Sequence, residues 1–406
     1  MPRPCRVKSS LDELALLGGE PAFSAPLHVG RPNVGDRQAI LRRIADTLDR
    51  RWLTNDGRYV REFEQRLAEA VGARHCVATC NGTLALQVAA RALGLSGEVV
   101  MPSLTFVASA HALAWDGLVP AFADVDPRSV CIDACRAAAV TGPRTAALLG
   151  VHLWGRTCDV EALEALARER GVALLFDAAQ AVGCSPEGRP IGACGDATIF
   201  SFHATKVANT FEGGAIATDD AELAERAERM RNFGFVDEDV VVSLGTNAKM
   251  SEPAAAMGLA SLEALDDFID HNRANYEHYR QGLARVPGVE LLSLPRPESS
   301  NCHYITVEVN PGIAGIDRDD LRRLLAAENV LARRYFYPGC HRMEPYRSRR
   351  VPHAPLPVTE RLLDHCLSLP TGTATPRKAI ELVCQLIELA VGHAAELAPR
   401  LRAAAD

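Results

Sequence analysis

The residues best suited to chemistry lie in two short segments near the middle of the chain. Lys206 ends the stretch 199–206, and Asp177 directly follows residues 174–176, which have the apolar pattern of a buried strand. Downstream, Gly213-Gly214 forms a turn that enters another strand pattern. A lysine can hold an aldehyde as a Schiff base, and a carboxylate can keep a pyridine nitrogen protonated so that the ring accepts electrons. Together they are the minimum set for pyridoxal phosphate chemistry.

The composition is that of a globular enzyme with an acidic balance. The chain has 406 residues, of which 48% are hydrophobic and 23% charged, and its formal net charge is −7. This length favours a major domain plus a smaller one. Because there is no basic block, nucleic acid is not an expected partner. No apolar run reaches about 18 residues, so no membrane span is expected.

The amino terminus and the cysteines favour a cytoplasmic protein. The first residues carry charges but no apolar stretch of the kind found in secretory signals. The 12 cysteines are interpreted as reduced, buried thiols. The pairs Cys76/Cys80 and Cys131/Cys135 have no matching second pair at zinc-site spacing, so no metal site is expected.

From about Arg74 to Thr218, short β-rich runs alternate with helical patterns. This alternation of strand and helix patterns predicts an α/β protein whose mostly parallel sheet is covered by helices on both faces. Strands are expected at 76–80, 98–101, 119–123, 146–152 and 172–176, and helices at 84–95, 105–115 and 159–170. Ligands of such sheets bind beyond the carboxyl ends of the strands. The turns after residues 80, 101, 151 and 176 are therefore the candidate site.

After about Ser251 the pattern changes. One long helix is predicted from Glu252 to about Leu283, followed by a strand at 303–309 and helices at 318–328 and 377–391. These elements predict a smaller α+β domain. We therefore expect two domains, with the amino-terminal segment and the large cofactor-binding domain in residues 1–250 and the smaller domain in 251–406.

Gly82 and Thr83 follow Asn81 between a strand and a helix, where small residues let backbone N–H groups approach an anion at the positive end of the helix. Ser201, five residues before Lys206, carries a hydroxyl that can bind the same phosphate. Taken alone, a Gly-Thr pair at a helix start is more often a simple cap.

Each other candidate also has an ordinary structural interpretation. Asp177 at a strand end can cap a following helix, Lys206 can be a solvated side chain, and Gln180 can be a surface amide. The complete set in this order and spacing favours the chemical interpretation over three unrelated coincidences.

Together these segments resemble the sugar aminotransferases of the DegT/DnrJ/EryC1/StrS family, which have the aspartate aminotransferase type I fold. The resemblance extends from about Pro26 to Pro376. Its supporting segments are residues 52–54, 81–86, 102–108, 122–126, 177–180, 201–206 and 245–252.

The resemblance implies a role for each residue around the cofactor ring. Lys206 holds pyridoxal phosphate covalently and later moves the proton, so Lys206 and Asp177 are the expected catalytic residues. Asp177 pairs with the pyridinium nitrogen, Gln180 reaches the phenolic oxygen, and Phe106 stacks on the ring face. A related dehydratase branch has histidine in place of the lysine, so Lys206 argues against dehydration.

The same resemblance implies a shared phosphate site. Gly82, Thr83 and Ser201 hold the phosphate in their own subunit, and Asn247 is donated by the neighbouring subunit. The expected assembly is therefore a homodimer whose active sites both need two chains.

Three positions depart from the commonest family pattern. Gln180 stands where many members have histidine, Val207 replaces the usual asparagine, and Asn55-Asp56-Gly57 replaces a frequent Gly-Pro. None of these changes removes a catalytic group, but they make the substrate contacts harder to predict than the cofactor contacts.

The resemblance further implies a ping-pong transamination with L-glutamate as the amino donor and a keto nucleotide sugar as the acceptor. Segments 202–214 and 245–250 look most like members that aminate C4 of dTDP-4-keto-6-deoxyglucose, giving dTDP-4-amino-4,6-dideoxyglucose for a natural product such as an antibiotic, or for a glycan. The alternatives are amination at C3 of a dTDP-3-keto-6-deoxyhexose, or amination of a keto-cyclitol. A non-catalytic regulator is disfavoured because Lys206 and Asp177 are both present.

A nucleotide sugar needs cationic and aromatic contacts. An alternative interpretation of the one cluster that offers them is an exposed loop. The cluster consists of Arg333, Arg334, Tyr335, Tyr337, His341 and Arg342.

Overall fold

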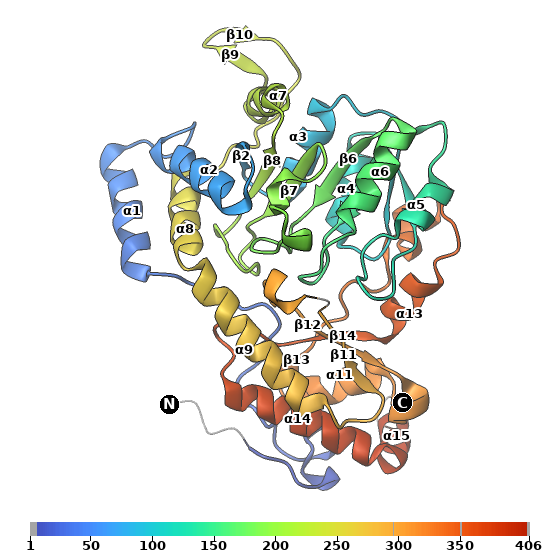
Figure 1. Cartoon of the computed structure of the whole chain (residues 1–406). Coiled ribbons are helices and arrows are strands. Elements are labelled where there is room, and N and C mark those ends of the chain that lie inside the picture. Colours follow the sequence, from blue (N-terminus) through green and yellow to red (C-terminus); the bar gives the residue numbers. More distant parts are fainter. Residues whose placement is uncertain (1–5, 295, 350, 404–406) are drawn as a thin grey trace.

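A seven-stranded sheet forms the centre of the molecule (Figure 1). The computed structural model describes residues 6–294, 296–349 and 351–403. The strand order is β2-β8-β7-β6-β5-β3-β4, and every strand except β8 runs in the same direction. The expected mostly parallel sheet is confirmed. Its strands are β2 (His75–Thr79), β3 (Glu98–Pro102), β4 (Val119–Ala123), β5 (Thr145–Val151), β6 (Ala173–Asp177), β7 (Ala197–Ser201) and β8 (Gly214–Thr218).

Most helices of this part begin at a residue whose side chain or turn geometry suits a helix start. Asp159 begins α6, where its carboxylate accepts from the Ala162 N–H at 3.0 Å, and Gly171 ends that helix in a left-handed conformation. The helices are α1 (Arg37–Arg50), α2 (Arg58–Val71), α3 (Gly82–Ala92), α4 (Val107–Trp115), α5 (Ala134–Val140), α6 (Val160–Arg170) and α7 (Ala221–Arg231).

Alternate side chains of the strands pack into different hydrophobic clusters. Ile199 and Ile216 belong to the cluster that contains α3, whereas Phe200 and Ala215 belong to the cluster formed with α2 and α8. Because successive side chains of a strand point to opposite faces, helices cover both sides of the sheet. With both faces covered, the open carboxyl ends of the strands are the accessible part of the sheet.

The carboxy-terminal part has its own antiparallel sheet and hydrophobic cluster. Strands β11 (Val289–Leu291), β12 (Ile305–Val309) and β14 (Cys366–Leu369) pair side by side, and β1 (Leu27–His28) pairs with β13 (Val330–Leu331). Leu11, Leu14 and Phe23 pack into the same cluster, so the amino-terminal segment folds against the carboxy-terminal half. The division at residue 250 stays a prediction. The remaining helices are α10 (Pro311–Ala314), α11 (Arg318–Ala327), α12 (Glu344–Arg347), α13 (Pro357–His365), α14 (Arg377–Gly392) and α15 (Ala394–Ala403).

The single helix predicted over 252–283 is wrong, because two helices occupy that range. α8 (Glu252–Glu263) and α9 (Leu265–Leu283) meet at Ala264, whose N–H bonds to the Leu262 carbonyl and breaks the α-helical ladder. α8 packs on the large sheet, while the later turns of α9 pack with the carboxy-terminal cluster. The bend between α8 and α9 lets each helix pack against its own cluster. No glycine or proline at the bend indicates it in the sequence.

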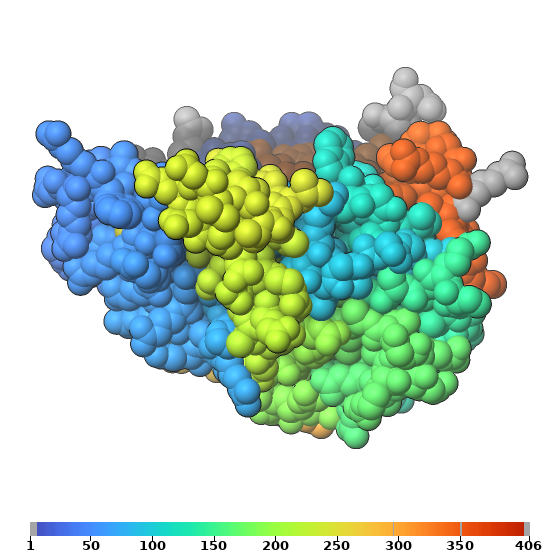
Figure 2. Space-filling view, turned by 90° about the horizontal axis from the view of Figure 1, so that it is seen from above, coloured from blue at the N-terminus to red at the C-terminus, as the bar shows by residue number. Residues whose placement is uncertain are grey.

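A hairpin of strands β9 (Phe235–Asp237) and β10 (Val240–Val241) projects from the body beyond α7 (Figures 1 and 2). Its apolar side chains are uncovered, and Leu244 is 79% exposed. Of the helices that the structure describes, none is long and apolar enough to cross a membrane.

Candidate active site

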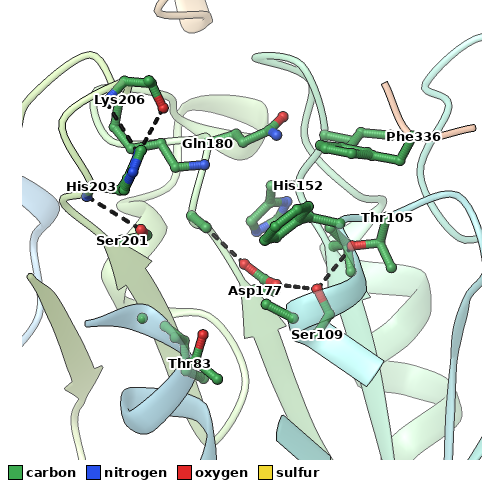
Figure 3. Close-up of a pocket in the computed structure, with 18 of the residues that line it drawn as sticks. Thr83, Thr105, Ser109, His152, Asp177, Gln180, Ser201, His203, Lys206 and Phe336 are labelled. Atoms are coloured by element: carbon green, nitrogen blue, oxygen red, sulfur yellow. Dashed lines mark hydrogen bonds between the residues drawn. The ribbon is translucent and has the colours of Figure 1, made fainter. Parts of the chain in front are cut away.

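A cavity of about 370 Å³ opens at the carboxyl ends of β5, β6 and β7, beside the start of α3 (Figure 3). All the predicted site residues except Asn247 line it: Gly82, Thr83, Phe106, Asp177, Gln180, Ser201 and Lys206. These residues come from separate strand ends and turns, so the fold brings together what the sequence spreads over more than a hundred positions.

Asp177 is the last residue of β6, and both of its carboxylate oxygens are held. Ser109 on α4 donates its hydroxyl to Oδ2 at 2.6 Å, and the Ala179 N–H donates to Oδ1 at 3.0 Å. The two donors therefore fix the orientation of the carboxylate. No α-helix follows Asp177, so its side chain holds a turn and faces the cavity instead of capping a helix.

Lys206 follows β7 in a tight turn, where its N–H donates to the His203 carbonyl at 2.9 Å. No described residue hydrogen-bonds its Nζ atom. Burial lowers the pKa of Lys206 to about 8, against the opposing attraction of Asp177. The amine therefore exchanges its proton near neutral pH, as a general base or a nucleophile requires.

Gln180 has a fixed amide orientation. Its Oε1 accepts from the Trp154 N–H at 2.9 Å. Because that oxygen is occupied, the NH₂ group is left to donate toward the cavity that Gln180 lines.

The start of α3 forms an anion cradle beside Ser201. Asn81 satisfies two of the first helical N–H groups, accepting from Leu84 at 2.8 Å through its side chain and from Ala85 at 3.1 Å through its carbonyl. In the part of the chain that the structure describes, the N–H groups of Gly82 and Thr83 have no acceptor. A Cβ at Gly82 would lie 3.0 Å from the Ser201 Cβ and fill the gap. The cradle therefore fits a phosphate group.

Aromatic side chains form the opposite wall. Phe106 precedes α4 and is 56% exposed, and its ring centroid lies 5.6 Å from that of Phe336. Tyr335 stacks on Phe336 at 5.0 Å, and both line the cavity. Sequence reasoning selected Tyr335 and Tyr337 but missed Phe336, although the aromatic run itself was the signal.

The residues of the cluster proposed for substrate contacts have different partners in the structure. Arg334 pairs with Asp319 at 3.1 Å, and Arg342 pairs with Asp364 at 2.9 Å, so both cations are engaged elsewhere. Of the six residues, only Tyr335 lines the cavity.

Two further residues of that cluster, His341 and Arg333, also differ in their contacts. The Ser103 hydroxyl lies 2.6 Å from Nδ1 of His341 and fixes that ring. Arg333 is exposed and forms no ion pair with any described residue.

Sequence reasoning also did not assign several polar side chains that line the cavity, among them Ser109, His152 and His303. His152 is the first residue after β5, at a turn already expected to contribute to the site. Ser109 lies one helical turn after Phe106, so its place beside the site could also have been predicted. His303 reaches the cavity from the carboxy-terminal part, through a packing that local patterns do not reveal.

Asn247 lies outside the cavity. It is exposed and forms an isolated bridge with Asn232 at the base of the hairpin. Its predicted contribution to a neighbouring subunit stays a prediction. Among the described residues, no group of three or more His, Cys, Asp or Glu side chains is arranged to hold a metal ion.

Comparison with known proteins agrees with this geometry. A crystal structure of DesI in the presence of its TDP-sugar product superposes with a TM-score of 0.93 and 52% identity, covering 97% of this chain and 100% of DesI. S. venezuelae DesV in complex with a ketimine intermediate superposes with a TM-score of 0.82 and 32% identity, covering 87% of this chain and 95% of DesV. The dTDP-4-amino-4,6-dideoxy-D-glucose transaminase of Shigella dysenteriae is 37% identical over 314 residues, which is 77% of this chain and 85% of that protein.

The match extends to a family model. Residues 35–388 match the model of the DegT/DnrJ/EryC1/StrS aminotransferase family. The anion cradle, the held carboxylate and the buried lysine fit the phosphate, the ring nitrogen and the aldehyde of pyridoxal phosphate. This chain therefore belongs to the DegT/DnrJ/EryC1/StrS aminotransferase family, whose aminotransferases depend on pyridoxal phosphate.

Proposed function

We propose that this aminotransferase transfers the amino group of L-glutamate to C4 of dTDP-4-keto-6-deoxyglucose, giving dTDP-4-amino-4,6-dideoxyglucose. The observation that carries the reaction type is the convergence of Lys206 and Asp177 on one cavity with an anion cradle. The substrate class is supported by the names of the relatives, which include a transaminase of that amino sugar and a protein solved with a TDP-sugar product. We place the reaction in the cytoplasm, within a pathway to a natural product or glycan.

When bound, pyridoxal phosphate supplies an aldehyde that combines with amines and a cationic ring that withdraws electrons. The N–H groups of Gly82 and Thr83, with the Ser201 hydroxyl, would hold its phosphate. Asp177 would face the ring nitrogen and Phe106 the ring. Gln180, whose amide donors are free, would bind the ring oxygen.

Lys206 is the proposed proton carrier. Its pKa of about 8 leaves about a tenth of the amine neutral at pH 7, compared with far less for an ordinary lysine. The neutral amine removes the proton from Cα of the amino donor. In the second half of the reaction, the same nitrogen gives a proton to C4 of the sugar.

A second copy of the chain is proposed to complete the site. Among the described residues that line the cavity, Lys206 is the single lysine or arginine, against the carboxylates Asp177 and Glu212. The cofactor phosphate and a nucleoside diphosphate both bring negative charge. The exposed Asn247 and the apolar hairpin beside it have the position and chemistry to reach a partner.

Arg333 is proposed to bind the diphosphate of the nucleotide sugar. Its backbone pairs with Ser368 at 3.0 and 2.7 Å, as in a β-ladder. Arg334 pairs with Asp319, whereas Arg333 is exposed, meets no carboxylate among the described residues and lies two residues before Tyr335, which lines the cavity. The positive charge of Arg333 opposes the burial that raises the pKa of Tyr335.

The substrate proposal is tested with a panel of acceptors: dTDP-4-keto-6-deoxyglucose, a dTDP-3-keto-6-deoxyhexose and a keto-cyclitol, each with glutamate or glutamine. We expect the highest kcat/KM for the 4-keto sugar with glutamate, and a product carrying the amine at C4 by NMR. A preference for the 3-keto sugar or the cyclitol would replace the proposed substrate with that alternative.

Covalent capture of the cofactor should occur at Lys206. The rate at which cofactor-free protein captures the aldehyde should rise with pH and level off near pH 8, because only the neutral amine attacks. An ordinary lysine would continue to gain rate up to about pH 10. Borohydride reduction and peptide mapping should locate the pyridoxyl group on Lys206, and Lys206→Ala should remove it. A label on another lysine would refute the assignment.

The shared site is tested by mixing two inactive variants, Lys206→Ala and Asn247→Asp. The aspartate places a carboxylate against the cofactor phosphate, and the repulsion should abolish activity. In a heterodimer, one site contains both lesions and the other contains neither, so activity should return. If no activity returns in heterodimers verified by native mass spectrometry, Asn247 acts in its own subunit.

Arg333→Gln should raise the KM for the nucleotide sugar about 10-fold or more, since a charge-assisted hydrogen bond is lost. The KM for glutamate should stay unchanged. Arg334→Gln is the matched control, because its partner is Asp319, and it should leave both constants near the wild-type values. An effect of Arg333→Gln on glutamate alone would assign the arginine to the amino donor instead.

A further inference from the structure

His152 has a buried hydrogen-bond donor that no described residue uses. The residue is 0% exposed, lines the cavity, and its Nε2 atom has no partner. In the view of Figure 3 the ring lies between Gln180 and Asp177. A polar atom left unpaired in a protein interior is destabilising, so an unpaired donor on a residue that lines a cavity is a candidate for a ligand contact.

The surroundings of the ring fix both its orientation and its tautomer. The Cys158 N–H donates to Nδ1 at 3.0 Å, so Nδ1 is an acceptor and the neutral ring carries its proton on Nε2. The ring stacks on Phe176 with centroids 4.9 Å apart and planes 6° from parallel. Burial lowers the pKa of His152 to about 3, so the ring stays neutral at every working pH.

The other buried histidine of the cavity shows the contrast. His303 has a contact at each ring nitrogen, with the Thr205 carbonyl 2.9 Å from Nε2 and the Asn272 amide 3.2 Å from Nδ1. Burial alone therefore does not leave a histidine nitrogen unpaired here. Of these two buried histidines of the cavity, His152 is the one with an unpaired Nε2.

The acceptor is identified by elimination. Asp177 already accepts from Ser109 and Ala179, and no hydrogen bond joins it to Nε2 of His152. A cofactor placed as proposed has its phosphate at α3 and its protonated ring nitrogen toward Asp177. Its phenolic oxygen is the one ring acceptor that remains. His152 follows β5, its backbone lies next to Asp177 on β6, and it lines the same cavity.

We propose that His152 is a cofactor-binding residue whose Nε2–H donates to the phenolic oxygen of pyridoxal phosphate, alongside the amide of Gln180. Two neutral donors at one oxygen stabilise its negative charge without adding a cation near Lys206. This inference rests on the proposed function, because it uses the cofactor orientation set by Asp177 and α3.

The direct test is the Nε2–H resonance of His152 in cofactor-free protein labelled with ¹⁵N-histidine, assigned by its loss in His152→Leu. Adding pyridoxal phosphate should move this proton downfield, as a new hydrogen bond requires. Inorganic phosphate, which fills only the anion cradle, should leave it in place. A shift that needs the nucleotide sugar would assign the donor to the substrate and overturn the proposal.

Cofactor affinity, measured by absorbance titration, gives the second readout. His152→Leu should weaken binding about 10- to 100-fold, as expected for a hydrogen bond to a charged oxygen, whereas His152→Gln, which keeps an N–H donor, should recover most of the loss. His111→Leu is the matched control, because His111 is exposed on α4 and bonds Tyr346. Equal affinity of wild type and His152→Leu refutes this inference alone. Failure of the wild type to bind cofactor at all would refute the proposed function.

Discussion

The site depends on one carboxylate being held in place at the end of a buried strand. Asp177 meets this requirement through two neutral donors, the Ser109 hydroxyl and the Ala179 N–H, and not through a cation. A cation at that position would neutralise the charge that the ring nitrogen of the cofactor needs. Ser109 belongs to the helix that Phe106 precedes, so the same short helix positions both the aromatic face and the carboxylate. Moving α4 would therefore disturb two contacts at once.

The remaining electrostatics follow from keeping Lys206 partly neutral. A buried amine is easily deprotonated, but the phosphate of a bound cofactor would raise its pKa again by attraction. The positive end of α3 offsets this effect locally, because the unpaired N–H groups of Gly82 and Thr83 compensate the phosphate where it binds. Gln180 and His152 likewise offer N–H donors that carry no net charge. In the proposed function, the cavity would therefore hold an anionic cofactor mainly with N–H dipoles, and Lys206 is the single lysine or arginine among the described residues that line it.

The residues that line this cavity were largely predictable because local rules locate them, while their roles stay predictions. Strand ends, a glycine-rich helix start and a lysine after a strand can be recognised one segment at a time, which selected residues 82, 177, 201 and 206. Gln180 was selected by the family resemblance. Contacts between segments that lie far apart in the sequence could not be predicted from local patterns. The pairing of Arg334 with Asp319 and the arrival of His303 depend on how the second half packs against the first. The break at Ala264 also escaped prediction, since its cause is the direction of packing and not a helix-breaking residue.

The two adjacent arginines show why specificity is harder to read than chemistry. Arg333 and Arg334 are identical in type, yet their surroundings differ. Arg333 forms a backbone bridge with Ser368, whereas Arg334 begins the turn that ends at Tyr337. Asp319 pairs with Arg334 and engages its charge. Arg333 meets no carboxylate among the described residues and lies two residues before Tyr335 at the cavity wall. The ion-pair partner of each arginine, and not the presence of a basic cluster, therefore decides which cation is left to face a nucleotide sugar.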